Sequence, residues 1–471
     1  MAIPQTVTVL EQIPVSPPPE ATAEMSLPLT FLDVVWLTLP PVHRLIFYPH
    51  PVSRTGFLDS IIPKMRKSLS QTLQHYTSLA GRVVTSPDNA IVPEIRYAEG
   101  DTVPLIIAEF NSGESNNFNN LVSDQARSSM DYQPLIPRLP PTSRAPNGSV
   151  VVPVFALQVT LFPDVGFCIG VTNHHIIGDG SSIFGFMKAW SGLCFSSHGD
   201  SKKDNTSSQC VPFYGNVEVK DGQRLTKLYW DILKNISIEE THNVNRRPLI
   251  TNKVRSTFVV TRDDIQRLKN RVLALRSDLV HVSSFTMICS HIWSCLVRSR
   301  NEIGENDVED EEDEHFLCPA DCRARLDPPV QGNYFGNCVV PCLGRAMTKE
   351  LIGEEGFIKA AEVIGESIRG QLYNKEKDGV LRGADSWLTV ISGFNFGRTM
   401  SLAGSPKFDY YELDFGWGKP KKFDIPSIDV TGAISLGAAK DHEGGLEVGL
   451  ALPVAQMHIF TNIFKEGLKA L

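Results

Sequence analysis

Two apolar runs that lead directly into a pair of histidines constrain the fold of this chain more than any other feature. Residues 151–161 and 165–172 have the length and apolar composition of buried strands, and residues 182–193 follow with the character of a helix. Between them, residues 173–181 read Asn-His-His-Ile-Ile-Gly-Asp-Gly-Ser. This strand–strand–loop–helix pattern predicts an α/β protein in which a polar loop leaves the end of a strand and projects into a cleft.

The first histidine of this loop, His174, has the chemistry of a general base. Imidazole titrates near neutral pH, so it can take a proton from a hydroxyl and return it to a leaving group. Asp179 follows five residues later and can fix the ring or the loop, and the glycines on both sides of it permit a tight backbone path. We expect His175 to point the other way and to be structural. Adjacent histidines diverge on a strand, so no metal site is expected.

The length of the chain predicts two domains, because 471 residues exceed what one hydrophobic core usually supports. Residues 196–208 are polar and lack an apolar period, which is typical of the start of a linker. We therefore expect domains at residues 1–200 and 249–471, joined by a linker or crossover at residues 201–248.

Composition excludes several classes of function. A formal net charge of -8 argues against a nucleic-acid-binding surface, which is normally basic. No run of about 18 apolar residues occurs, so we expect no membrane partner. Residues 1–19 have neither a basic start nor an apolar stretch, unlike a signal peptide. The nine cysteines are scattered without Cys-x-x-Cys spacing, which fits a reducing compartment, and we expect a cytoplasmic monomer.

A second motif lies near the C-terminus, where residues 414–418 read Asp-Phe-Gly-Trp-Gly. Residues 410–415 are predicted to form a strand that ends in this glycine-rich turn. Together with His-His-x-x-x-Asp at residues 174–179, the motif resembles the paired signatures of the plant BAHD acyltransferases. Three further stretches resemble the same family: Leu-Thr-Phe-Leu-Asp at residues 29–33, Asp-Cys-Arg-Ala-Arg at residues 321–325 and Tyr-Phe-Gly-Asn-Cys at residues 334–338.

The resemblance implies a chloramphenicol acetyltransferase-like α/β fold, with two similar-sized domains whose mixed sheets are flanked by helices. A solvent channel would run between the domains, with His174 at its middle as general base. The histidine would remove a proton from a sugar hydroxyl, which would then attack the thioester of an acyl-CoA. The acyl-CoA would be a co-substrate, and no bound cofactor is implied. Holding both substrates at once would supply much of the rate gain.

The resemblance also narrows the substrates. The Tyr-Phe-Gly-Asn-Cys form resembles the branch that acts on anthocyanin, flavonoid and other phenolic glycosides, with malonyl or hydroxycinnamoyl as the acyl group. Some malonyl-transferring relatives have an arginine shortly after the motif aspartate, whereas residues 181–184 here read Ser-Ser-Ile-Phe. This departure leaves room for an aromatic donor. Residues 323–338 look closest to the malonyl group, so malonyl is favoured and hydroxycinnamoyl is the alternative.

Four residues of the two motifs and their surroundings carry alternative roles. The resemblance implies that Asp179 fixes its loop through an ion pair, with Arg323 as the candidate partner, while a direct relay to His174 stays open. It also implies that Asp414 is needed for activity, as a second acid or base. The Gly-Trp-Gly turn instead favours a structural role for Asp414 in the channel wall, where Trp417 would pack.

Binding of CoA is assigned by resemblance to Lys253, Arg255, Ser283 and Ser284. Cations and helix N-termini suit the phosphates of CoA. The alternatives are ordinary surface charge for the basic pair and a plain helix cap for the serines.

Two other classes of function remain to be weighed. A hydrolase of acyl esters would usually present a serine on a Gly-x-Ser-x-Gly elbow, and Gly-Asp-Gly-Ser-Ser at residues 178–182 does not match it. A non-catalytic binding module would keep the fold without the chemistry, against which the intact His174 argues.

Overall fold

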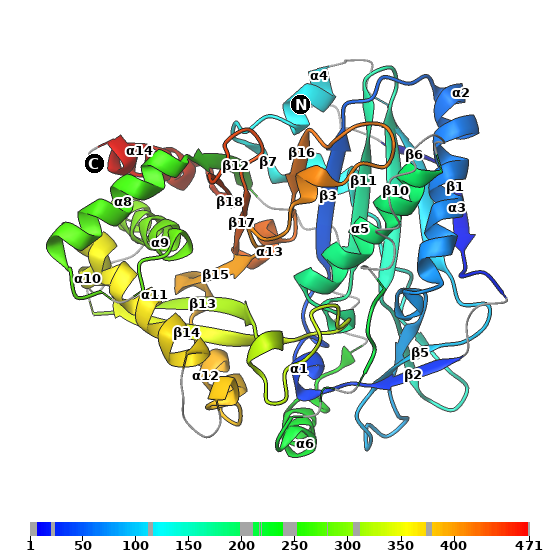
Figure 1. Ribbon diagram of the computed structural model, residues 1–471, viewed down its shortest axis with the longest axis horizontal. Helices are drawn as coiled ribbons and strands as arrows, with labels where there is room; N and C mark the ends of the chain where they lie inside the picture. The colour runs from blue at the N-terminus through cyan, green and yellow to red at the C-terminus, as the bar shows by residue number, and fades with distance from the viewer. Residues whose placement is uncertain are drawn as a thin grey trace.

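The computed structural model describes residues 7–19, 24–111, 116–197, 211–215, 217, 219–238, 252–279, 281–304, 311–373 and 379–469. Two halves lie side by side, each built on a mixed β-sheet with helices packed on it (Figure 1). Among the described residues, every helix is too short or too polar to span a bilayer.

The first half is built on a six-stranded sheet. Its strands run in the order β1 (Val7–Val15), β6 (Val103–Phe110), β10 (Phe155–Phe162), β11 (Gly166–Asn173), β3 (Val42–Tyr48) and β16 (Lys422–Asp424). Helices α3 (Ile62–Leu73) and α5 (Gly180–Ser196) cover one face, while α4 (Asn116–Leu121) and the 3-10 helix η3 (Ser129–Leu135) cover the other. The two central strands β10 and β11 are buried along their whole length, which explains their unbroken apolar sequences.

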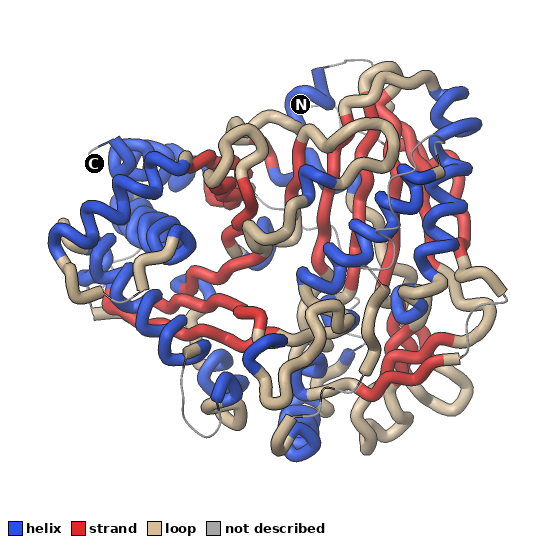
Figure 2. The backbone as a smooth tube through the Cα atoms, in the orientation of Figure 1, coloured by secondary structure: helices blue, strands red, loops and turns tan. Residues whose placement is uncertain are grey.

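The predicted strand at residues 151–161 is divided in the structure. Its first part is β9 (Val150–Pro153), which belongs to a separate five-stranded sheet (Figure 2), and its second part is β10. Val154 lies at the break, and its carbonyl accepts a hydrogen bond from the His174 N–H at 2.7 Å. The small sheet has the order β2 (Met25–Pro28), β5 (Glu94–Tyr97), β4 (Arg82–Val84), β9 and β8 (Ser143–Arg144).

The second half is built on a seven-stranded mixed sheet. Its order is β14 (Val339–Met347), β13 (Asp313–Asp321), β15 (Thr399–Ala403), β17 (Ile434–Ala438), β18 (Leu446–Pro453), β12 (Lys253–Val260) and β7 (Arg127–Ser128). Its core lies between this sheet and four helices: α8 (Arg262–Leu275), α9 (Ser284–Glu302), α11 (Gly356–Leu372) and α14 (Val454–Lys469).

The two halves exchange strands. β16 comes from the C-terminal part of the chain but pairs with β3 of the first sheet, whereas β7 comes from the N-terminal part but pairs with β12 of the second. The segment that leads to β16 was predicted to contain a strand at residues 410–415. It forms a 3-10 helix (Tyr410–Glu412) and a turn instead, because its side chains pack on the first half rather than pairing in a sheet.

The predicted linker at residues 201–248 lies partly outside the described residues, which omit 201–210 and 239–248. Within it, α6 (Gly222–Leu233) packs against α1 (Phe31–Val34) of the first half. The Phe31 N–H donates to Thr226 Oγ1 at 3.0 Å, and the Phe31 ring meets Tyr229 edge-on. This part of the segment is therefore folded onto the N-terminal half.

Candidate active site

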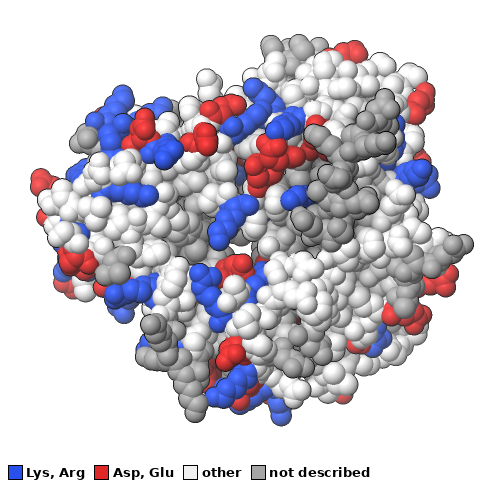
Figure 3. All heavy atoms as spheres, in the orientation of Figure 1, with Lys and Arg blue, Asp and Glu red and all other residues white. Residues whose placement is uncertain are grey.

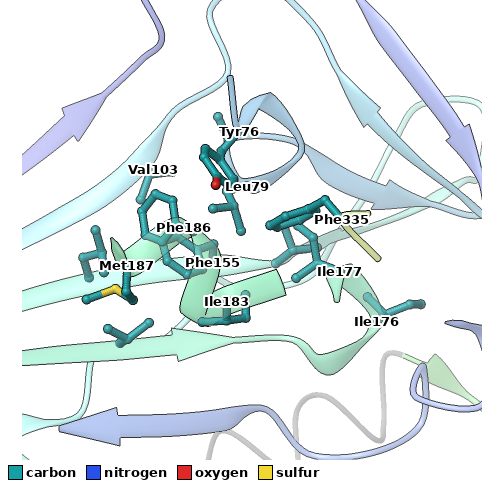
Figure 4. Close-up of a cluster of buried hydrophobic side chains, with 14 of the residues drawn as sticks. Tyr76, Leu79, Val103, Phe155, Ile176, Ile177, Ile183, Phe186, Met187 and Phe335 are labelled. Atoms are coloured by element: carbon teal, nitrogen blue, oxygen red, sulfur yellow. The ribbon is translucent and has the colours of Figure 1, made fainter. Parts of the chain in front are cut away.

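His174 is the first residue after β11, where the chain leaves the sheet. Its side chain is fully buried, and the next three residues form a short 3-10 helix (His175–Ile177). Ile176 and Ile177 anchor this turn, because both are buried among the apolar side chains of the first half, and Figure 4 shows Ile177 beside Phe335. The histidine is thus held between a strand end and a turn fixed by packing.

The His174 ring contacts the backbone of its own loop. Its Nδ1 accepts a hydrogen bond from the Ile176 N–H at 3.2 Å, so in this arrangement the neutral ring carries its proton on Nε2. General-base action at Nε2 requires the other neutral tautomer, with the proton on Nδ1. Reaching that tautomer gives up one long hydrogen bond, a cost of about 1 kcal/mol.

Asp179 begins α5 and is turned towards Arg323. Its side chain caps the helix by accepting from the Ser182 N–H at 3.1 Å, and its two oxygens lie 2.8 Å and 3.1 Å from the Arg323 guanidinium. Burial opposes the charged form of Arg323, but the Asp179 carboxylate outweighs it and the pKa of Arg323 is raised. The structure therefore brings Arg323 onto Asp179, as an ion pair between the two halves.

The Tyr-Phe-Gly-Asn-Cys motif holds the other side of the His174 loop through hydrogen bonds. Asn337 Nδ2 donates to the carbonyls of His175 and Ile176 at 3.0 Å and 3.2 Å. Its Nδ2 also reaches Asp33 Oδ1 at 3.1 Å. The stretches at residues 29–33 and 334–338 resemble the family in sequence. They gave no sign of the contact between Asp33 and Asn337, because these residues lie far apart in the chain.

His175 is structural. Its ring stacks on Trp36 with centroids 3.7 Å apart, and its Nδ1 lies 3.1 Å from Asn337 Oδ1. Burial lowers the pKa of His175 to about 4, so the ring is neutral at physiological pH.

Asp414 holds the turn of the second motif. Its Oδ1 accepts from the N–H groups of Gly416 at 2.7 Å and Gly418 at 3.0 Å. Both glycines have positive φ, +100° and +94°, which other residues rarely adopt. The carboxylate thus organises a backbone turn that only this glycine pattern accommodates.

The same motif docks onto the first half through its aromatic side chains. Phe415 is fully buried and meets Trp190 of α5 edge-on, with centroids 4.9 Å apart. The half-buried Trp417 meets Phe167 of β11 in the same way. Tyr48 of β3 donates to the Leu413 carbonyl at 2.8 Å. These contacts place the segment against the first half, which carries His174.

Arg255, which we expected to bind CoA, has buried protein partners in the structure. Its side chain is 2% exposed and lies between Asp424 and Asp429, while it also donates to the Ile425 carbonyl at 2.8 Å. A guanidinium committed to two carboxylates offers no cation to a phosphate. Its contact with Asp424 joins β12 of the second half to β16, which belongs to the first sheet.

The other three CoA candidates have partners of their own. Lys253 Nζ donates to the Asp429 carbonyl at 3.0 Å, and burial lowers its pKa. Ser283 caps α9 by accepting from the Thr286 N–H at 3.1 Å. Ser284 Oγ accepts a hydrogen bond from Lys269 Nζ at 3.1 Å. The sequence did not single out this lysine. No hydrogen bond joins Lys253 to either serine within the described ranges.

The surface has a hollow between the two halves and a small pocket beside the loop. The face in Figure 3 is hollowed where the two halves meet, with basic and acidic side chains along the border. A small pocket with a cavity volume of about 50 Å³ lies beside the loop and is lined among others by Thr30, Asp33, Ile177 and Gly336. It touches the turn at Ile177 and not the ring of His174.

A further buried cation adjoins the loop. Arg44 of β3 is 6% exposed, and its Nη1 lies 2.5 Å from Asn173 Oδ1. Asn173 Nδ2 in turn donates to the His174 carbonyl at 3.1 Å. The sequence did not single out Arg44. A single arginine in an apolar strand does not indicate which strand it pairs with, and here the paired strand β11 leads into the His174 loop.

Two solved structures have the same arrangement of strands and helices. Vinorine synthase aligns with a TM-score of 0.66 at 19% identity, covering 96% of each chain. TRI101 of F. graminearum, complexed with ethyl coenzyme A, aligns with a TM-score of 0.62 at 16% identity, covering 93% of this chain and 96% of that one. At this identity the likeness shows a shared fold.

Sequence relatives cover nearly the whole chain. A malonyl-coenzyme A:anthocyanin 3-O-glucoside-6''-O-malonyltransferase from Dahlia pinnata is 40% identical, covering 98% of both chains. A malonyl-coenzyme:anthocyanin 5-O-glucoside-6'''-O-malonyltransferase from Salvia splendens is 38% identical, covering 99% of this chain and 96% of the relative. A coumaroyl-CoA:anthocyanidin 3-O-glucoside-6''-O-coumaroyltransferase from Arabidopsis thaliana is 31% identical, covering 99% and 98%. The model of the Transferase family matches residues 5–466, and the chain belongs to this family, the BAHD acyltransferases whose two motifs it carries.

Proposed function

We propose that this protein transfers an acyl group, malonyl before hydroxycinnamoyl, from CoA to a sugar hydroxyl of a flavonoid, anthocyanin or other phenolic glycoside. The malonyl-transferring relatives are 38% and 40% identical to the chain, against 31% for the coumaroyl-transferring one. All three names carry a glucoside acceptor. The donor preference follows this order of similarity.

In the proposed reaction His174 acts as general base within a ternary complex. It takes the proton of the acceptor hydroxyl, whose oxygen attacks the thioester carbonyl and forms a tetrahedral adduct. When the adduct collapses, the carbon–sulfur bond breaks and the imidazolium gives its proton to the departing CoA thiolate. An ester and free CoA result, and the histidine returns to its neutral form.

The observation that carries this proposal is the placing of His174 by contacts from both halves of the molecule. On one side of the loop, Arg323 forms an ion pair with Asp179. On the other side, Asn337 donates hydrogen bonds to the carbonyls of His175 and Ile176. Arg323 and Asn337 both come from the C-terminal part of the chain, after residue 320, whereas His174 directly follows a strand of the first sheet. A residue held at the boundary between the halves can meet a donor and an acceptor that approach from different sides.

Lys253, Ser283 and Ser284 remain our proposal for the CoA phosphates, with Lys269 added because it contacts Ser284. The serines open α9, a helix of 19 residues whose first N–H groups and macrodipole favour an anion. Asp414 is proposed to act through its turn, since its Oδ1 already accepts two backbone N–H groups.

The proposal is tested by incubating the purified protein with malonyl-, coumaroyl-, caffeoyl- and acetyl-CoA and a panel of phenolic glucosides. Free CoA and the mass of the acceptor are followed together. CoA release only in the presence of both substrates, with the matching mass increase, is the expected result. CoA release with water alone would identify a hydrolase, and binding without turnover would identify a binding module.

The base is tested by comparing His174→Ala with His175→Gln. We expect His174→Ala to lower kcat by about 100-fold or more at an unchanged thermal midpoint, because proton removal is lost. His175→Gln, a change at the neighbouring structural ring, should retain most of the turnover. Wild-type turnover in His174→Ala would contradict the assignment.

A further inference from the structure

Four arginines are buried in the described part of the chain: Arg44, Arg255, Arg323 and Arg398. Taking a guanidinium out of water is unfavourable unless its charge is paired. Three of the four obey this rule with two carboxylates each. The pairs are Arg255 with Asp424 and Asp429, Arg323 with Asp179 and Asp321, and Arg398 with Glu312 and Glu314.

Arg44 is the exception. Its Nη1 contacts the amide oxygen of Asn173 at 2.5 Å, and it interacts with the buried phenol of Tyr410. Neither partner carries a negative charge at neutral pH, and no described carboxylate forms an ion pair with it. Burial and the positive charge of Arg44 together lower the pKa of the neighbouring His43 to about 4, so that ring is neutral as well.

The Arg44 guanidinium is connected to the loop of His174, the proposed general base. β3 and β11 pair antiparallel, with Arg44 opposite Val171, two residues before the end of β11. The guanidinium holds Asn173, and Asn173 holds the carbonyl of His174. Arg44 is therefore linked to the base by one intervening side chain.

A malonyl thioester carries its carboxylate one methylene away from the carbonyl carbon under attack. Any protein group that binds this carboxylate must therefore lie near His174. The segment directly after Asp179 reads Gly-Ser-Ser-Ile-Phe at residues 180–184 and supplies no cation. Arg323, the nearest motif arginine, already has two carboxylates.

We propose that Arg44 receives the terminal carboxylate of the malonyl donor and so determines donor specificity. The bound carboxylate gives the fourth buried arginine the countercharge that the other three have within the protein. A planar guanidinium suits a carboxylate through charge-assisted hydrogen bonds. An uncharged acyl group would leave Arg44 unpaired. The inference rests on the proposed acyl transfer and names the substrate feature that the site selects.

The test compares malonyl-CoA with acetyl-CoA, the same donor without the carboxylate, in the wild type, Arg44→Gln and Arg44→Lys. We expect Arg44→Gln to lower kcat/KM for malonyl-CoA by about 100-fold while acetyl-CoA changes by less than about threefold. Arg44→Lys keeps the charge and should recover part of the malonyl activity. Equal losses with both donors would overturn the proposal, because they would mean that Arg44 only positions Asn173. Unchanged malonyl activity would overturn it too.

Arg54→Gln is the matched control, because it removes an arginine that is 58% exposed and paired with Glu109 on the surface. It should leave both donors unchanged. Calorimetric binding to the wild type adds a readout that needs no variant: malonyl-CoA is expected to bind at least about tenfold more tightly than acetyl-CoA, and equal affinities would contradict the assignment. Wild-type protein that transfers no acyl group from any donor would contradict the proposed function itself. Transfer that ignores the donor carboxylate would contradict only the role of Arg44.

Discussion

Arg323 binds both carboxylate oxygens of Asp179, through Nη1 to Oδ2 at 2.8 Å and Nη2 to Oδ1 at 3.1 Å. The Cys338 N–H donates to Oδ2 at 3.0 Å, and the Ser182 N–H donates to Oδ1. Both oxygens of the carboxylate are thus used in joining the loop of His174 to the second half. We therefore expect Asp179 to act on the position of His174 rather than on its proton.

The first prediction concerns this ion pair. Asp179→Asn leaves Arg323 buried with only the exposed Asp321 as counterion, and we expect the free energy of unfolding to fall by about 3–5 kcal/mol. Turnover should fall with it, because the loop loses its anchor. Chemical denaturation and steady-state kinetics on the same preparations measure both effects.

Asp321→Asn is the matched control, since it removes the other carboxylate of the same arginine. Its side chain is 57% exposed, so we expect a loss of at most about 1 kcal/mol and nearly normal turnover. An Asp179→Asn protein with wild-type stability but no activity would contradict the anchoring role and favour a direct relay to His174.

The second prediction distinguishes a structural role of Asp414 in its turn from a role in proton transfer. Asparagine keeps an oxygen that can accept from Gly416 and Gly418, so Asp414→Asn should retain turnover within about tenfold of the wild type. Asp414→Ala removes the acceptor and leaves the turn unsupported, and it should lose stability and activity together. Thermal denaturation and kcat measured on both variants decide the matter. A stable Asp414→Asn protein without turnover would indicate that the carboxylate itself takes part in proton transfer.

Sequence patterns predicted the parts of this site that are local in the chain. The strand that ends at Asn173, the turn and the helix that starts after Asp179 lie in one continuous stretch, so periodicity and capping residues identify them. The pairing of Asp179 with Arg323 joins residues 144 positions apart, and it came from the resemblance rather than from spacing.

The remaining features depend on tertiary contacts that no local pattern records. Arg255 looked like a surface cation because its partners Asp424 and Asp429 reach it only through the exchange of β16 into the first sheet. Residues 410–415 looked like a strand because apolar side chains recur along them, yet Tyr410 and Phe415 pack against α5 without joining a sheet. Glu314 sits in an acidic run but is buried between Arg300 and Arg398.

The third prediction concerns acid stability. Burial lowers the pKa of His43, His175 and His291 to about 4, whereas the same rings titrate near 6.5 in the unfolded chain. Below pH 6.5 the unfolded state therefore binds more protons than the folded state, and stability falls until the pH reaches about 4. Asp429, whose pKa burial raises to about 6, opposes this trend between pH 6 and 4, because its folded form takes up a proton first.

Burial also lowers the pKa of His281 and His315, and it raises the pKa of four further carboxyls, which oppose the trend as Asp429 does: Asp33, Asp131, Glu314 and Glu447. All five histidines take up protons near pH 6.5 in the unfolded chain, so we expect acidification from pH 6.5 to lower stability. We expect the thermal midpoint to be constant between pH 7 and 8 and to fall steadily from pH 6.5 to 4.5. Calorimetric scans across this range measure it. An Asp429→Asn variant should show a steeper decline than the wild type, relative to its own midpoint at pH 7.5. A midpoint that stays level down to pH 4.5 would contradict the neutral state of the buried rings.

The last prediction tests the role given to Arg255. Arg255→Met leaves Asp424 and Asp429 buried without a countercharge, so unfolding should become easier by about 3–5 kcal/mol. Replacing the three residues together, as Arg255→Met with Asp424→Leu and Asp429→Leu, removes every buried charge of the cluster and should restore most of that loss. Because the Arg255 guanidinium is buried against protein carboxylates, the folded fraction of either protein should keep the wild-type KM for acyl-CoA. A single variant with normal stability and a KM raised about tenfold or more would return Arg255 to the CoA site.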